Sequence, residues 1–121
     1  MQFNDTQLDA VQQFLQAGNL LAYPTEAVWG IGCDPFNETA VKQILAIKQR
    51  PIEKGMIVIT GDIAHIQSFL QPLSQQVVDS IAASWQSSDA QATTWLLPIP
   101  ASLQGKIPDW VTGGRDSLAI R

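Results

Sequence analysis

Three basic residues gather in one short stretch of this sequence, Lys48 and Arg50 in Lys48-Gln49-Arg50-Pro51 and Lys54 just beyond it. The whole chain has seven lysines and arginines and a net charge of −4. Cations this close repel one another unless an anion binds, and phosphate is the anion that such groups commonly hold. The alternative is a solvated basic helix end, which the helix dipole favours. The stretch therefore predicts either a phosphate site or an ordinary helix terminus.

A second candidate group lies upstream, in the loop Tyr23-Pro24-Thr25-Glu26 that follows an apolar segment. Ligands of open α/β sheets bind where strands end, and Pro24 stiffens this loop. The Thr25 hydroxyl both donates and accepts hydrogen bonds, which suits a small polar substrate such as an amino acid. The alternative is an ordinary turn in which Thr25 bonds its own backbone. Glu26 either pairs with the cationic stretch or is solvated.

A third pair stands in the last segment, where Ser117 and Arg121 lie four positions apart on an expected strand. Side chains at this spacing share one face of a strand. A hydroxyl beside a guanidinium suits a phosphate or a carboxylate. Chance alternation on an edge strand is the other interpretation.

Several kinds of site are excluded by what the motifs lack. Gly30 and Gly32 permit close backbone approach or positive φ, but they form neither a Walker loop nor a dinucleotide fingerprint. His65 has no second ligand at metal-binding spacing. The single Cys33 has no partner for a disulfide or a zinc site, so we expect a reducing compartment.

Composition sets the scale of the protein. A chain of 121 residues with 45% hydrophobic residues fits one small domain with a real core. The polar start, Met1 to Asp5, does not look like a signal peptide, and no apolar run approaches the roughly 20 residues of a membrane helix. The negative net charge argues against tight non-specific nucleic-acid binding, although a local basic patch could contact RNA.

The elements that must position these residues alternate between helix and strand, which favours a layered α/β domain. Capping residues and apolar spacing predict helices over 5–16 (capped by Asp5 or Thr6), 37–50 (Asn37), 62–70 (Asp62) and 74–85 (Ser74). Strands are expected at 20–23, 56–60, 93–97 and 117–121, with 56–60 central and 117–121 at an edge unless the chain is a fragment. The segments 24–35 and 101–115 are expected to be loops.

Two further expectations concern burial. The apolar stripe of the second helix, Val41, Ile44 and Leu45, continues to Lys48, so the stem of Lys48 could be packed while its amine points into a cleft. The four tryptophans are expected in the core or at an interface; they are Trp29, Trp85, Trp95 and Trp110.

Five motifs in order resemble the YrdC family. They are Tyr-Pro-Thr-Glu-Ala at 23–27, Gly-x-Gly-Cys-Asp at 30–34, Lys-x-Arg-Pro at 48–51, Lys54 before a short strand, and Asp-Ser-Leu-Ala-Ile-Arg at 116–121. The resemblance runs from about residue 20 to residue 121. It implies a single YrdC-like α/β domain over 1–121, a twisted mixed open sheet flanked by helices, without the C-terminal part of the family domain. The family's Ser-x-Asn signature would follow Arg121.

The resemblance implies a reaction in which L-threonine, bicarbonate and ATP give threonylcarbamoyl-adenylate and pyrophosphate. This cytoplasmic nucleotidyltransferase supplies the threonylcarbamoyl modification of tRNA, together with other tRNA-modification proteins, and uses ATP with Mg²⁺. Matched position by position, the catalytic residues are Lys48 and Arg50, which face the triphosphate; Lys54 and Ser117 contact the nucleotide; and Thr25 and Arg121 bind L-threonine.

Departures from the family pattern leave two alternatives. Ile59 stands where longer relatives carry a histidine near the threonine, and the absent Ser-x-Asn predicts weak or no synthase activity, to be tested against a C-terminally extended version. One alternative is a double-stranded RNA-binding module, which the family's basic concave face suggests. The other is an inactive fragment that dimerises through an exposed edge strand.

Overall fold

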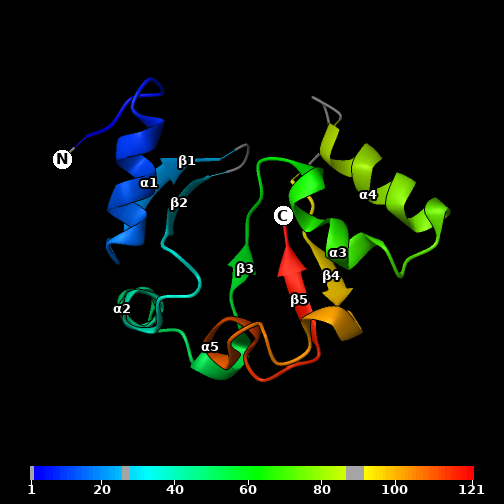
Figure 1. The fold of residues 1–121 in the computed structure, drawn as a ribbon. Coiled ribbons are helices and arrows are strands. Elements are labelled where there is room, and N and C mark those ends of the chain that lie inside the picture. Colours follow the sequence, from blue (N-terminus) through cyan, green and yellow to red (C-terminus); the bar gives the residue numbers. More distant parts are fainter. Residues whose placement is uncertain (1, 26–27, 87–91) are drawn as a thin grey trace. The chain divides into compact units, whose positions relative to one another are not determined.

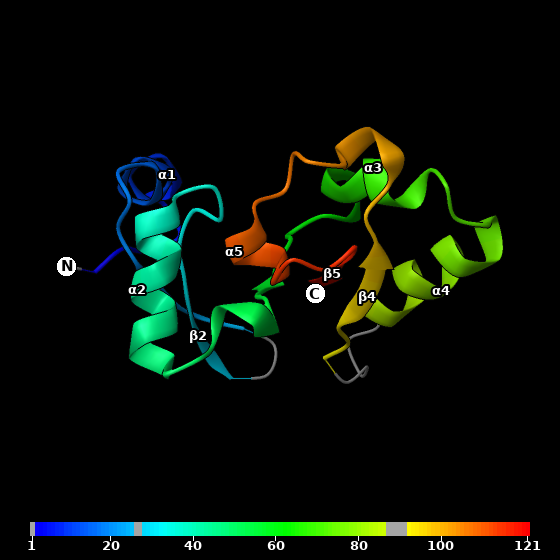
Figure 2. The same cartoon turned by 90° about the horizontal axis from the view of Figure 1, so that it is seen from below.

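The computed structural model describes residues 2–25, 28–86 and 92–121, so Glu26 lies outside the described residues. The chain forms two compact units, residues 1–50 and residues 51–121. Figures 1 and 2 show the elements of each unit in two orientations.

The first unit joins two helices to a hairpin. Its elements are α1 (Leu8–Gln16), β1 (Leu21–Pro24), β2 (Trp29–Gly32) and α2 (Glu38–Lys48). β1 and β2 pair antiparallel, with Tyr23 opposite Gly30. The apolar stripe of α2 is buried as expected, at Ala40, Val41, Ile44 and Leu45.

Helix starts in this unit divide into one confirmed and one wrong prediction. Asn37 caps α2, because its side chain accepts a hydrogen bond from the Ala40 amide at 3.0 Å. α1 begins after Gln7 with no side-chain cap, so the caps expected at Asp5 or Thr6 are wrong. Thr6 instead bonds the Asn4 side chain through both its amide and its hydroxyl, which keeps it in the preceding turn.

The segment that forms strand β2 was expected to be loop, because its two glycines are typical of turns. In the structure these glycines serve the packing of the strand. A Cβ on Gly32 would lie 2.8 Å from the Tyr23 hydroxyl oxygen, and one on Gly30 would lie 3.1 Å from the Tyr23 ring. Neither glycine has positive φ. The Gly-x-Gly motif therefore gives the Tyr23 ring room to lie across the neighbouring strand, and a side chain at either position would displace it.

The second unit contains a three-stranded sheet covered by helices. Its strands are β3 (Ile57–Val58), β4 (Trp95–Pro98) and β5 (Ser117–Ile120), and its helices are α3 (Gln67–Leu70), α4 (Gln75–Gln86) and α5 (Asp109–Thr112). Three short 3₁₀ helices, Ile52–Lys54, Ile63–Ile66 and Ala101–Leu103, complete it. The last of these and α5 lie in the segment 101–115 that was expected to be loop.

The strand order of this sheet is β3-β5-β4, with β5 parallel to β3 and antiparallel to β4. The sheet is therefore mixed, as expected. An edge position was one of two alternatives for the segment 117–121, and it is wrong, because β5 is the central strand (Figure 1). The segment 56–60 was expected to be central, but β3 is an edge strand of two residues. An apolar run occurs in central and in edge strands, so it does not distinguish the two. Ile57 of the edge strand β3 is apolar and still 50% exposed.

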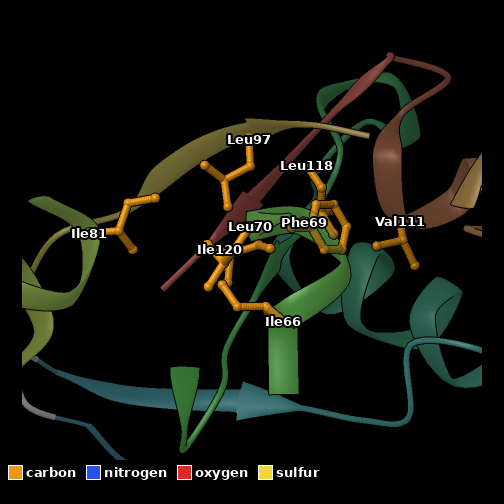
Figure 3. Close-up of a cluster of buried hydrophobic side chains, with 8 residues drawn as sticks. All are labelled: Ile66, Phe69, Leu70, Ile81, Leu97, Val111, Leu118 and Ile120. Carbon is orange, nitrogen blue, oxygen red and sulfur yellow. The ribbon is translucent and has the colours of Figure 1, made fainter. Parts of the chain in front are cut away.

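One face of the sheet carries the core. The largest fully buried side chains there are Ile81 and Ile120, and they belong to a cluster with Ile66, Phe69, Leu70, Leu97, Val111 and Leu118 (Figure 3). Asp62 and Ser74 cap the covering helices as expected, by accepting from the amides of Ala64 and Val77. The remaining face of the sheet is open, and Ile57 and Leu96 flank Ala119 on it.

Three of the four tryptophans pack where they were expected. Trp85, Trp95 and Trp110 are partly buried against the core cluster. The Trp85 indole donates to the Thr93 carbonyl at 2.9 Å, and the Trp95 indole donates to the Ser84 hydroxyl at 2.8 Å, which ties α4 to β4. Trp29 differs, because it is 73% exposed on β2.

Candidate anion-binding site

The six residues singled out in the sequence are divided between the units. Thr25, Lys48 and Arg50 belong to residues 1–50, and Lys54, Ser117 and Arg121 belong to residues 51–121. The cationic stretch thus spans the unit boundary, which follows Arg50. Each half is described within its own unit.

Lys48 is exposed as a whole residue, so packing of its stem stays a prediction. α2 ends at Lys48, and Gln49 takes the left-handed conformation with φ of 52°. This turn lets the Arg50 amide donate to the Leu45 carbonyl at 2.9 Å. The helix therefore ends at Lys48, and this exposed residue carries its charge at the helix terminus.

The Thr25 hydroxyl takes part in a local turn. It accepts a hydrogen bond from the Val28 amide at 3.1 Å and donates to the Val28 carbonyl at 2.5 Å. This is the ordinary-turn arrangement. A ligand that bonds this hydroxyl would either add to its hydrogen bonds with Val28 or replace one of them.

A small pocket in the second unit brings two of the expected residues together. Lys54 and Ser117 line a space of about 30 Å³ with Arg115, above Leu96 and Ala119 of the open sheet face. Arg115 was not singled out in the sequence, because it lies outside the motif that begins at Asp116. The order Gly113-Gly114-Arg115 is the signal that was available, since paired glycines permit a tight turn just before the strand.

Two glycines at positive φ hold this pocket in shape. Gly55 (φ 71°) and Gly113 (φ 72°) sit in backbone-to-backbone contact. A Cβ on Gly113 would lie 2.6 Å from the Glu53 carbonyl oxygen, and one on Gly55 would lie 2.9 Å from the Thr112 carbonyl oxygen. The Met56 amide donates to the Val111 carbonyl at 2.7 Å. The segment that carries Lys54 is thereby fixed against the end of α5, which precedes Arg115.

The two cations of the pocket have no ion pair with any residue in the described part of the chain. Glu53 and Asp116 directly neighbour Lys54 and Arg115 in sequence, yet neither carboxylate reaches them. Like charges on one small pocket raise its potential, which an anion lowers. Both Lys54 and Arg115 are exposed, and Ser117 is partly buried.

Arg121 lies at the other end of the strand from this pocket. The burial of Leu118 and Ile120 confirms that Ser117 and Arg121 share the open face. Four residues of strand separate their Cα atoms by roughly 13 Å, and binding of one group by both side chains stays a prediction. The Arg121 amide donates to the Val58 carbonyl, and its carbonyl accepts from the Thr60 amide, both at 2.9 Å.

These bonds place Arg121 at the carboxyl ends of two parallel strands, β3 and β5. That is the usual ligand-binding edge of such sheets. Ile59 lies between the two residues that bond Arg121 and is 45% exposed. An apolar side chain therefore stands at the position where the family resemblance implies a histidine.

The described residues contain no group of three histidine, cysteine, aspartate or glutamate side chains that could hold a metal ion. His65 is exposed. Cys33 is partly buried, and this burial, with a smaller effect of the Asp34 charge, raises the pKa of its thiol. No described helix is long and apolar enough to cross a membrane.

The fold and these sites define a mixed α/β protein with cations at the ends of its strands. The family model Sua5_yciO_yrdC, described as "Telomere recombination", matches residues 13–121. The chain belongs to this family, which confirms the resemblance to YrdC proteins.

Two curated relatives carry the name threonylcarbamoyl-AMP synthase. The protein from Psychrobacter cryohalolentis is 53% identical over 113 residues, which cover 89% of this chain and 53% of the relative. The protein from Acinetobacter baylyi is 50% identical over 109 residues, which cover 88% of this chain and 55% of the relative. The chain thus spans about half the length of these relatives.

Solved structures show the same fold. P. abyssi Sua5 complexed with L-threonine matches with a TM-score of 0.77 and 25% identity, covering 100% of this chain and 33% of that one. A variant of P. abyssi Sua5 gives a TM-score of 0.78 at 25% identity, covering 99% and 34%. The expected α/β fold class is therefore confirmed.

Proposed function

We propose that this chain serves the synthesis of threonylcarbamoyl-adenylate from L-threonine, bicarbonate and ATP, with release of pyrophosphate. The observation that carries the proposal is the identity of 53% to a relative named threonylcarbamoyl-AMP synthase over most of this chain. The structure of P. abyssi Sua5 complexed with L-threonine supports the amino-acid substrate. The activity would be that of a nucleotidyltransferase in tRNA modification, and we propose the cytoplasm as its location.

The roles proposed for individual residues follow the chemistry of their side chains. Lys48 and Arg50 would face the triphosphate and stabilise the charge that develops on it, and Lys54 and Ser117 would contact the nucleotide. Arg121 would hold the threonine carboxylate, and the Thr25 hydroxyl would contact the amino acid. The position of Arg121 at a ligand-binding strand edge supports its role.

The mechanism that these groups support is positioning and electrostatic stabilisation. The threonine amine and bicarbonate form a carbamate with loss of water, the carbamate oxygen attacks the α-phosphate, and pyrophosphate leaves. Negative charge grows on the α-phosphate oxygens and the departing pyrophosphate, where fixed cations lower the barrier. The sites described above offer cations and hydroxyls, which do not suit a protein-held Mg²⁺. We propose that Mg²⁺ arrives with ATP, bound through its phosphates.

A matched pair of variants on α2 tests this function. Lys48 and Lys42 are both exposed lysines of that helix, and Lys42 forms an ordinary helical ion pair with Glu38 at 2.7 Å. With ATP, L-threonine and bicarbonate, we expect adenylate formation to fall about tenfold or more in Lys48→Gln, because a charged phosphate contact is lost. Lys42→Gln should match the parent protein. Mass spectrometry of the adenylate and the release of pyrophosphate measure both.

The parent protein provides the test that can reject the proposal. The proposal is rejected if the parent forms no adenylate and if neither ATP nor L-threonine raises its melting temperature. Equal rates in Lys48→Gln and Lys42→Gln would reject only the role of Lys48.

Binding to tRNA, to double-stranded RNA or to other tRNA-modification proteins stays a prediction. The net charge of −4 argues against strong non-specific binding. If RNA is a ligand, its affinity should fall steeply as salt increases, whereas the melting temperature should respond to ATP and L-threonine only if the small-molecule site is present.

A further inference from the structure

We propose that Arg115 is a phosphate-binding residue. With Lys54 and Ser117 it would form a subsite for one phosphoryl group of a polyphosphate, the pyrophosphate half of ATP before its release. This inference rests on the proposed function and adds a residue to it. It is carried by the pocket that these three residues line.

The pocket is small, and part of its lining is cationic. A space of about 30 Å³ has room for about two water-sized groups, such as two oxygens of a phosphoryl group. Four lining residues have polar side chains, namely Lys54, Thr112, Arg115 and Ser117. The Thr112 hydroxyl accepts a hydrogen bond from the Gly114 amide at 3.1 Å. The other three carry an ammonium, a guanidinium and a hydroxyl. All three donate hydrogen bonds, and neither cation accepts them. A phosphoryl group, which offers several acceptor oxygens, complements this set.

The backbone segment that carries Lys54 is held against the end of α5. Lys54 ends the 3₁₀ helix Ile52–Lys54, and Gly55 and Gly113 press that segment against the end of α5. Because no described residue forms an ion pair with Lys54 or Arg115, nothing in that part of the chain competes with an anion for their charges.

Arginine at this place has a specific consequence. Its planar guanidinium binds two oxygens of one phosphate at once, whereas lysine acts as a point charge. Arg115 should therefore contribute more than its charge, and Arg115→Lys should restore only part of the affinity.

The test uses inorganic pyrophosphate as the probe and isothermal titration calorimetry as the measurement. We expect Arg115→Gln to weaken pyrophosphate binding about tenfold or more, because a charge-assisted contact is lost. The control is Lys106→Gln, which removes one charge from another exposed cation of the same unit outside this pocket. It should bind as the parent does. Melting curves of all variants verify that each is folded.

Three results would overturn the subsite. They are equal affinities in the parent and Arg115→Gln, equal losses in Arg115→Gln and Lys106→Gln, or no pyrophosphate binding by the parent. Each is separate from a failure of the proposed function. That failure would appear as an absence of threonylcarbamoyl-adenylate and of any L-threonine effect on melting, even if pyrophosphate binds.

Discussion

At the scale of single residues, the two ends of β5 have different surroundings. Ser117 opens the strand beside Lys54 and Arg115, and Arg121 follows its last residue beside β3. A strand four residues long keeps the Cα atoms of Ser117 and Arg121 roughly 13 Å apart. An extended substrate that lies along the open face would have its phosphates and its carboxylate recognised separately.

Arg121→Gln tests this separation. We expect L-threonine to bind about tenfold more weakly or worse, because the proposed partner of its carboxylate is lost, while pyrophosphate affinity stays unchanged. Calorimetry with each ligand measures both. Arg115→Gln is the matched control and should show the reverse pattern. Loss of both ligands in Arg121→Gln, with an intact melting transition, would contradict two separate contacts.

Cys33 gives a pH-dependent prediction. Burial first, and the Asp34 charge second, raise the pKa of the thiol, so the unreactive protonated form persists to higher pH than in an unfolded chain. Alkylation by iodoacetamide should therefore be slow at neutral pH and accelerate only at alkaline pH. Asp34→Asn should shift the pH profile to lower pH but not to that of an unfolded peptide.

The rate profile over pH, followed by mass spectrometry, measures the shift. A native profile that coincides with that of the urea-unfolded protein would show that burial has no effect on the thiol. The shift caused by Asp34→Asn is compared with the difference that remains between this variant and the unfolded protein. If the first is larger, the Asp34 charge and not burial is the main cause of the raised pKa.

At the scale of elements, local signals predicted most helices and the positions of most strands. Asn37, Asp62 and Ser74 act within one turn of the backbone, so their capping could be predicted from sequence alone. Neighbour relations in the sheet could not be, because an apolar run is compatible with the edge and with the centre. The central place of β5 depends on pairing with residues far away in the chain.

The candidate site shows the same limit. Motif residues such as Lys54 and Ser117 were identified from their resemblance, but their shared pocket depends on the contact of Gly55 with the end of α5. Arg115 belongs to no motif, and only the fold reveals its place. β2 was missed because its glycines resemble turn residues, although they serve the packing of Tyr23.

The glycine contact predicts a stability difference between two neighbouring substitutions. Gly114→Ala should cost about 1–2 kcal/mol, because φ is 78° but a Cβ there meets nothing within 4 Å. Gly113→Ala carries the same strain at φ of 72° and also pushes a Cβ against the backbone of Glu53 and Gly55. We expect it to cost about 1–3 kcal/mol more. Urea unfolding followed by circular dichroism gives both values.

This comparison has a built-in control, since both substitutions remove the same conformational freedom from the unfolded chain. Equal costs would mean that the close approach of the two backbone segments is not maintained in solution. A larger cost for Gly114→Ala would contradict the geometry altogether.

At the scale of the whole molecule, each unit buries its own apolar side chains. The first unit does so along α2, and the second does so in the cluster around Ile81 and Ile120. The tryptophans are divided unequally, with Trp29 in the first unit and the other three in the second. Tryptophan fluorescence should therefore report mainly on residues 51–121.

Trp29→Phe tests this division. Trp29 is 73% exposed when folded, so unfolding changes its surroundings little. The variant should keep the midpoint and nearly all the amplitude of the fluorescence transition. Trp85→Phe should lose a large share of the amplitude and about 1 kcal/mol of stability with its indole hydrogen bond to Thr93. A collapse of the amplitude in Trp29→Phe would show that Trp29 is buried in solution.

The central place of β5 has a consequence for the order in which the protein assembles. β1 and β2 are joined by a short connection, so their hairpin closes a small loop. In the described sheet, β3 and β4 each pair with β5. Ile57 pairs with Ala119, a residue far along the chain, whereas β1 pairs with the strand that follows it. Closing so long a loop is entropically costly and slows folding. We therefore expect the sheet that carries Lys54, Arg115 and Ser117 to be completed later than the hairpin, and its anion pocket to form with it.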